Sequence, residues 1–207
     1  MISESSRPTF QVVGIWGNGA AHMSSREAIL AAATRTAQAH GYAGINFREL
    51  ADEVGIKHAS IYHHFPSKAD LAVAVARRYW EDAAVNLEAM SEQGSDPADL
   101  LSRYPGTFRQ SLANENRICL CSFMAAEYDD LPQAVKAEVQ TFADVNVAWL
   151  AKTLSEAKGG RQSDHEAKAR AIFAAVAGAQ LMARSRSDIS LFDAIVDSYR
   201  SAGLLQP

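Results

Sequence analysis

Residues 46–71, NFRELADEVGIKHASIYHHFPSKADL, decide the fold of this protein. Asn46 is followed three residues later by Glu49, and this pair forms a capping box that starts a helix. Gly55 ends that helix, because glycine adopts the left-handed backbone of a helix C-terminus at little steric cost. Pro66 ends a second short helix, since proline lacks the N–H group that would continue it. The stretch therefore predicts two short helices joined by a tight turn.

Helix signals of the same kind continue on both sides of this stretch and predict an all-α fold. Apolar residues recur at helical spacing, and we find no strand-like alternation. Ser24 and Gly41 bound the first helix, and Ser67 starts the fourth. We expect Pro105 to kink the fifth helix. The nine predicted helices cover about residues 24–41, 47–54, 57–65, 67–91, 96–112, 118–127, 130–158, 163–184 and 188–204.

The composition is that of an ordinary globular protein, with 48% hydrophobic and 21% charged residues. No apolar run reaches the roughly 20 residues that cross a bilayer, so we expect no membrane contact. The N-terminus lacks the pattern of a secretory signal. Cys119 and Cys121 are one residue apart, which is poor geometry for a disulfide. These features favour a reducing, cytoplasmic setting.

Charge is distributed unevenly along the chain, whose formal net charge is −4. Residues 24–70 carry five positive and five negative side chains, while residues 71–207 carry fourteen positive and eighteen negative ones. Five of the six histidines fall in the first third. Either their placement is chance, or a phosphate field recruits their charge by raising the imidazole pKa. The overall negative charge therefore does not exclude nucleic-acid binding by the first third.

The two short helices have the pattern of a helix-turn-helix, in which the second helix lies in the major groove of DNA. Apolar residues lock the two helices together, namely Leu50, Val54, Ile56, Ile61 and Phe65. The remaining polar and small side chains face outward, and the start of the next helix offers backbone N–H groups to phosphate. The predicted DNA-binding residues are Asn46, Arg48, Lys57, His58, Ala59, Ser60, Tyr62, His63, His64 and Lys68.

The segment GIKHASIYHHFPSKADL resembles the signature of the tetracycline-repressor (TetR/AcrR) family, and the resemblance covers about residues 24–78. It implies an all-α homodimeric repressor that binds a pseudo-palindromic double-stranded DNA operator and is released by a small-molecule inducer. Two positions depart from the family pattern. Lys57 stands where Ser or Thr commonly caps the recognition helix, and Ala59 replaces a frequent glycine. The bases that are read therefore stay open.

These patterns divide the chain into three parts. We expect a flexible arm or leader over residues 1–22, the helix-turn-helix domain over 23–70, and a ligand-binding and dimerisation domain over 71–207. A metal site built from the histidines of the second short helix is not expected, because spacings of five and six residues splay ligands around a helix and no thiolate or carboxylate completes the set. No cofactor is expected either.

The segment ENRICLCSFMAAEYDDLPQAVKAEVQTFADVNVAWL resembles the subfamily of the repressors of N-ethylmaleimide reductase and acrylate utilisation genes (NemR-like and AcuR-like), over about residues 104–150. This resemblance implies a small organic ligand, including electrophilic or acrylate-like ones. Cys119 lies in the first turn of a short predicted helix, two residues after Arg117. The helix dipole and the positive charge of Arg117 would both lower the pKa of its thiol. The alternative is that both cysteines are packed apolar residues.

The candidate ligand-binding residues include aromatic and polar side chains of two further helices. Asn146 interrupts an apolar row and, if buried, needs a partner. That partner is either a ligand in a pocket walled by Trp149 or a group on a neighbouring helix. The kink at Pro105 either makes room for a pocket or is solvated. The candidates are Tyr104, Phe108, Cys119, Met124, Asn146 and Trp149.

Residues 169–183, ARAIFAAVAGAQLMA, are apolar on nearly every face of the predicted helix. Such a helix must be covered on both sides, and in a chain of this size the second cover is most simply another subunit. The last helix contributes further apolar residues, which predicts a two-fold dimer held by a four-helix bundle. The predicted interface comprises Phe173, Val176, Gly178, Leu181, Phe192, Ile195, Val196 and Tyr199.

Two other functions compete with the ligand-responsive repressor. One is an enzyme with Cys119 as nucleophile, although His165 is the only histidine of the second half and lies on a polar stretch, so a Cys–His pair has little support. Turnover of an acyl or electrophilic substrate would favour it. The other is a regulator controlled by a protein partner, which a fully packed core would favour.

Overall fold

The computed structural model describes residues 24–93, 96–157 and 161–206, and every regular secondary-structure element within them is a helix. The predicted arm over residues 1–22 lies outside the described residues. The elements are α1 (Ser25–His40), α2 (Phe47–Val54), α3 (His58–His64), α4 (Lys68–Glu92), α5 (Pro97–Arg103), α6 (Pro105–Ala113), α7 (Leu120–Ala126), a 3₁₀ turn η1 (Tyr128–Asp130), α8 (Gln133–Ala157), α9 (Gln162–Arg186) and α10 (Ile189–Ser201). The all-α prediction is confirmed.

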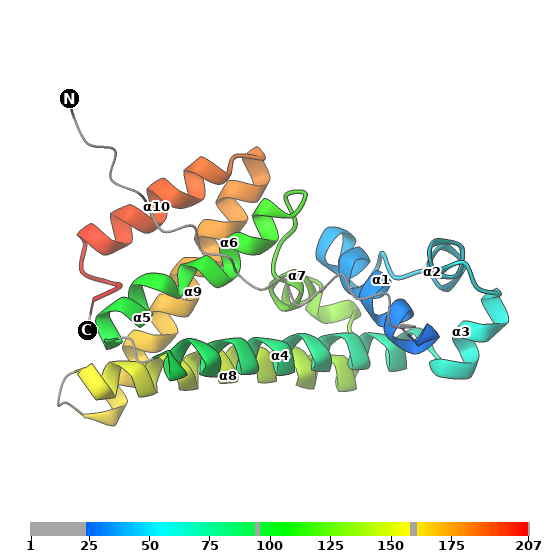
Figure 1. The fold of residues 1–207 in the computed structure, drawn as a ribbon, viewed down its shortest axis with the longest axis horizontal. Coiled ribbons are helices and arrows are strands. Elements are labelled where there is room, and N and C mark those ends of the chain that lie inside the picture. Colours follow the sequence, from blue (N-terminus) through cyan, green and yellow to red (C-terminus); the bar gives the residue numbers. More distant parts are fainter. Residues whose placement is uncertain (1–23, 94–95, 158–160, 207) are drawn as a thin grey trace.

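The helices form a small head and a larger body, joined by a long helix (Figure 1). α1, α2 and α3 lie at one end, and α4 runs from them along the whole body. α4 and α8 lie side by side and run in the same direction, with the Trp80 indole bonded to Glu138 and the Trp149 indole bonded to Ser91. α9 and α10 then pack on each other and complete the body.

Helix ends in the head fall where local chemistry predicts them. The hydroxyl of Ser24 accepts the N–H of Glu27, and the amide oxygen of Asn46 accepts the N–H groups of Arg48 and Glu49. The hydroxyl of Ser67 likewise caps α4. Such caps satisfy backbone donors that a helix leaves without an internal partner.

Pro105 divides the predicted fifth helix instead of only kinking it. α5 ends at Arg103 and α6 begins with Pro105 as its first residue. Proline is well placed there because its missing N–H would have no partner in a first helical turn. The prediction of one continuous helix over residues 96–112 is therefore wrong, and this division is why the described residues form ten α-helices where the sequence predicts nine.

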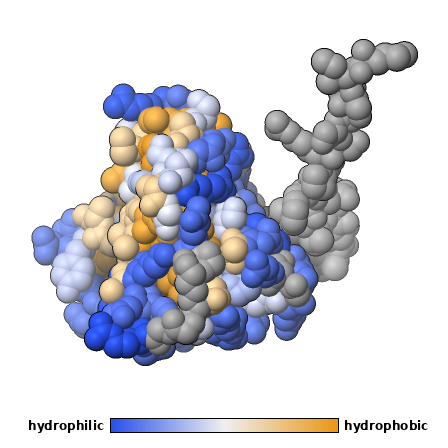
Figure 2. Space-filling view, turned by 90° about the vertical axis from the view of Figure 1, so that its left-hand side faces the viewer, coloured by the Kyte–Doolittle hydropathy of each residue, from blue (hydrophilic) through white to orange (hydrophobic). Residues whose placement is uncertain are grey.

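None of the described helices combines the length and apolar character that crossing a membrane requires. Apolar residues nevertheless reach the surface. At the end of the body remote from the head, they gather in a band between hydrophilic areas (Figure 2).

Candidate nucleic-acid interface

The turn between α2 and α3 depends on the backbone of Gly55, which has φ 74° and ψ 33°. Its N–H donates to the carbonyl of Asp52, and the next N–H, of Ile56, donates to that of Ala51. A β-carbon at Gly55 would meet no atom within 4 Å. Glycine is therefore needed here for its left-handed conformation and not for space.

The inner faces of α2 and α3 are locked into the head. Leu50 and Ile61 are almost fully buried, as are Phe47 and Phe65. Arg35 of α1 forms a hydrogen-bonded ion pair with Glu53 of α2, with 2.6 Å between Nη2 and Oε1. Because α3 is held by its apolar side, its opposite side must face solvent.

The outward side of α3 carries most of the residues predicted to bind DNA. The phenol of Tyr62 is 49% exposed, and its ring packs edge-on against Phe47 and His58 at centroid distances of 5.0 and 5.2 Å. These contacts fix the ring and leave its hydroxyl at the surface. Of the predicted set, Asn46, Arg48, Lys57, His58, Ala59, Tyr62 and His63 are exposed, and Ser60, His64 and Lys68 are half-buried.

Three predicted residues have particular local roles. Lys57 is the N-cap residue of α3 and makes no side-chain capping bond, as its unusual identity predicts. The amide oxygen of Asn46 is engaged in its cap. The ammonium of Lys68 donates to the carbonyl of Ala43 at 3.0 Å and lies over the ring of Tyr42, and burial lowers the pKa of Lys68. Lys68 thus connects α4 to the turn between α1 and α2 independently of any contact with DNA.

The head is attached to the body by contacts that the sequence did not suggest. The carboxylate of Glu127, just after α7, accepts the N–H of Tyr42 at 2.6 Å and that of Ala43 at 3.1 Å. A side chain at Gly41 would collide with that carboxylate. These residues lie 84 and 85 positions apart in the chain, so no local pattern could have revealed them.

A second attachment comes from α9. The guanidinium of Arg184 donates to the carbonyls of Gln38 and Ala39 at 3.0 and 2.9 Å, at the end of α1. It also lies over the ring of Phe123 of α7. Terminal carbonyls of a helix have no partner within it, so a cation there is favourable.

The candidate ligand-binding residues come together in the body as tightly packed side chains. Tyr104 stacks on Trp149 at a centroid distance of 5.8 Å, and Phe108 packs beside it at 5.9 Å. The hydroxyl of Tyr104 donates to the amide oxygen of Asn146 at 2.9 Å. The partner of the buried Asn146 is therefore a side chain of this chain, that of Tyr104 between α5 and α6. Met124 is also fully buried.

The expectation of a lowered thiol pKa at Cys119 is wrong. Cys119 is only 2% exposed, and burial raises the pKa of its thiol. It is the N-cap residue of α7, and its backbone N–H donates to the buried side chain of Gln180. Arg117 is hydrogen-bonded to Glu115 and is not a cause of any shift at Cys119. Burial of Cys121 raises its pKa even further.

The predicted dimer residues divide into two groups. Val176, Phe192 and Val196 are buried within the chain and form its own core, so their assignment to an interface is wrong. The helical period assigns these residues to an apolar face, but the sequence alone does not say whether that face packs inside the chain or against a second subunit. Gly178 and Leu181 are exposed, and the remaining three are half-buried, namely Phe173, Ile195 and Tyr199.

Comparison with known proteins agrees with this geometry. Residues 29–75 match the family model described as "Bacterial regulatory proteins, tetR family". A solved TetR-family transcriptional regulator from Agrobacterium tumefaciens is 30% identical and superposes with a TM-score of 0.78 over 84% of this chain and 94% of that one. The chain belongs to the TetR family. It is therefore a DNA-binding transcriptional regulator and not an enzyme, which sets aside the Cys119 nucleophile.

Two further TetR-family proteins show how far the likeness extends. The transcriptional repressor AcnR of Corynebacterium glutamicum is 42% identical over 71 residues, 34% of this chain and only 36% of that relative's length. The reduced form of NemR from E. coli has a TM-score of 0.73 at 21% identity, over 86% of this chain and 96% of that one. The second likeness shows a shared fold.

Proposed function

We propose that this TetR-family regulator is a homodimeric repressor that binds its operator through α3 and releases it when a small organic ligand binds. The observation that carries the proposal is the exposed outer side of α3, with Lys57, Tyr62 and His63 at the surface while Ile61 holds the helix from behind. AcnR is named as a transcriptional repressor, which supports repression as the effect of this protein on its operator. The proposal places the protein in the cytoplasm.

The proposal assigns DNA binding to one part of the chain and ligand binding and dimerisation to the other. Residues 23–70 form the DNA-binding head, and residues 71–207 provide ligand binding and dimerisation. α4 links the two parts, because its first residue, Lys68, is bonded to the head at Ala43 and the helix then packs along α8 in the body. A shift of the body against α4 therefore changes the position of the head.

Dimerisation is proposed through the exposed face of α9. Small and apolar residues follow one another there at helical spacing, and Leu181 and Met182 are 59% and 51% exposed. The other exposed members of this face are Ala171, Ala174 and Gly178. A two-fold axis at this face would present two copies of α3 to half-sites about 34–36 Å apart, one turn of DNA.

The ligand is proposed to act in the aromatic region around Tyr104. Because Tyr104 is stacked on Trp149 and bonded to Asn146, a ligand must displace one of these side chains to enter. That displacement would separate α5 from α8, the partner of α4. A ligand acts as an inducer only if it binds the displaced state more tightly.

Operator binding is tested with Lys57→Ala and Tyr62→Ala, each measured by retardation of the DNA upstream of the protein's own gene. Loss of a charged or hydroxyl contact to phosphate should weaken binding about ten-fold or more. Lys152→Ala is the matched control, because Lys152 is an exposed lysine of the body. If the two head variants bind like the control, α3 does not contact DNA in the proposed way.

The interface is tested with Leu181→Glu, which should give monomers in sedimentation analysis because it places a charge on the proposed seam. Val85→Glu is the matched control, since Val85 is an exposed valine of α4, 67% accessible. An unchanged dimer with Leu181→Glu, or a monomeric wild type, would exclude this face.

A further inference from the structure

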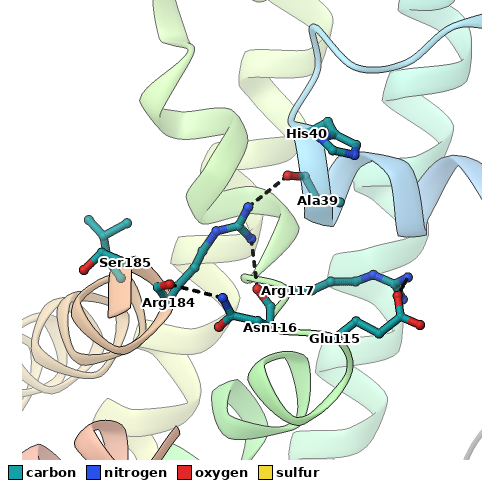
Figure 3. A pocket seen from close by; sticks show the side chains of 8 residues that line it. Ala39, His40, Glu115, Asn116, Arg117, Arg184 and Ser185 are labelled. Atoms are coloured by element: carbon teal, nitrogen blue, oxygen red, sulfur yellow. Dashed lines mark hydrogen bonds and ion pairs between the residues drawn. The ribbon is translucent and has the colours of Figure 1, made fainter. Parts of the chain in front are cut away.

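A groove of about 550 Å³ lies at the junction of head and body, away from the aromatic region. It is bounded by the end of α1, the loop between α6 and α7, and the last turns of α9 (Figure 3). The lining residues are Ala39, His40, Glu115, Asn116, Arg117, Leu181, Arg184 and Ser185.

The backbone around the groove is unusual. Glu115, Asn116 and Ser187 are the non-glycine residues with positive φ in the described chain, at 58°, 54° and 50°. The amide of Asn116 donates to the carbonyl of Arg184 and to the hydroxyl of Ser187, both at 3.1 Å, so the three residues are held at one place. Such conformations persist only where the surroundings enforce them, and they cluster at binding sites.

The charge of the groove favours an anion. The groove is lined by two guanidinium groups, of Arg117 and Arg184, and by a single carboxylate, that of Glu115. The guanidinium of Arg117 lies beside Glu115, whereas that of Arg184 points toward Ala39 and the carbonyl of Asn116 (Figure 3). The side chain of Arg117 is 14% exposed, whereas that of Glu115 is 75% exposed. An ion pair with so solvated a partner contributes little, so a carboxylate from solution can replace Glu115. Arginine suits this exchange because its planar fork matches a carboxylate.

The groove also has an apolar part. Leu181, 59% exposed, and Ala39 border it. Leu181 belongs to the proposed dimer face as well, so the apolar part lies beside the seam between two subunits. A ligand that satisfies both ends carries a carboxylate and a short hydrocarbon or aromatic group.

We propose that this groove is a second effector site, which binds a small organic carboxylate through Arg117 and Arg184. Occupation draws Arg184 away from its present partners, the carbonyls of Gln38, Ala39 and Asn116. The end of α1 then loses its attachment to α9, while the bonds from Glu127 to the N–H groups of Tyr42 and Ala43 and from the Ile118 N–H to the Gln38 carbonyl remain. This coupling rests on the proposed function, whereas binding of the carboxylate does not.

Binding is tested by titration calorimetry of the DNA-free wild-type protein with benzoate and with hexanoate. Benzamide and hexanamide, which have the same shape without the charge, serve as ligand controls. Arg117→Met should weaken binding about ten-fold or more, because it removes a charge-assisted contact. Arg186→Met is the protein control, since Arg186 is an exposed arginine on α9 that does not line the groove.

The proposed site would be excluded if benzoate and hexanoate at millimolar concentration gave no heat with the wild type. It would also be excluded if Arg117→Met and Arg186→Met bound them equally well. Equal binding of the amides would overturn the anionic chemistry. Arg117 is used because it takes no part in the attachment of α1, so its replacement leaves the head in place. Circular dichroism of both variants checks that they fold.

Coupling is tested by repeating the operator retardation in the presence of benzoate. The wild type should release DNA, while Arg117→Met should retain it at the same concentration. Release by both proteins, or by neither although the wild type binds benzoate, would overturn the coupling. Failure of the wild type to bind DNA without benzoate would instead overturn the proposed function, and calorimetry would still decide the site.

Discussion

Replacement of Glu127 by alanine should destabilise the protein through the α1–α2 turn. The carboxylate accepts the N–H of Tyr42 at 2.6 Å in a half-buried place and that of Ala43 at 3.1 Å near solvent. Alanine leaves both donors without this acceptor. A hydrogen bond to a charged group contributes about 1.5–3 kcal/mol, and an exposed one about 0.5 kcal/mol. We therefore expect a loss of about 2–3 kcal/mol in the free energy of unfolding.

Urea unfolding followed by circular dichroism measures this loss. With a slope of about 2 kcal/mol per molar urea, the midpoint should fall by about 1–1.5 M. Asp129→Ala is the matched control, because Asp129 is an exposed carboxylate two residues further along. Glu127→Gln should lie between wild type and alanine, since its amide keeps one acceptor oxygen. If Glu127→Ala unfolds at the same urea concentration as the control, the carboxylate does not hold the turn.

Three further outcomes are expected. Gly55→Ala should cost about 1–2 kcal/mol in urea unfolding because of its positive φ alone, and Gly55→Asn less; equal losses would show a steric cause. The Arg77 hydrogen bond, helped by Trp80, holds the pKa of Glu138 below its usual value against the opposing effect of burial. Glu138 therefore stabilises the fold above its unfolded pKa, near 4.5, and this contribution is lost as pH falls through the lower folded value. Glu138→Gln should accordingly flatten the acid limb of stability against pH, and an unchanged limb would exclude the ion pair as its source. Iodoacetamide should modify Cys119 of the folded protein far more slowly than in urea, by intact mass, because only the thiolate reacts and burial raises its pKa; rapid labelling without urea would contradict its burial.

The head was predictable because its signals are local. A cap such as Asn46 bonds to N–H groups two and three residues away, and Gly55 acts through its own φ. The period of three to four residues then determines that Ile61 faces inward and Tyr62 outward. Pro105 indicated that the helix is interrupted there, but whether a proline kinks or divides a helix depends on the packing on either side.

The body was less predictable because its decisive contacts are distant in sequence. Whether Cys119 is a thiolate depends on what covers it, and the cover comes from helices that the spacing of the cysteine does not reveal. Burial outweighed the hydrogen bonds from Ser122 and Tyr79 that lower the pKa of the Cys119 thiol, and Arg117 is not among the causes of the shift. Similarly, the apolar pattern of α9 could not say whether Val176 or Leu181 faces the chain's own core.

The sequence by itself thus determined the all-α fold, the ends of the helices in the head and the outward side of α3, since each depends on interactions within a few residues. Only the tertiary structure decided how the head is attached, because Glu127 and Arg184 reach its backbone from 84 to 146 positions away. Backbone N–H and carbonyl groups are present at every residue, so a sequence does not show which of them a distant side chain will bind. The segment from Asn46 to Leu71 identifies the surface proposed to meet DNA, and the contacts behind it determine where that surface is held.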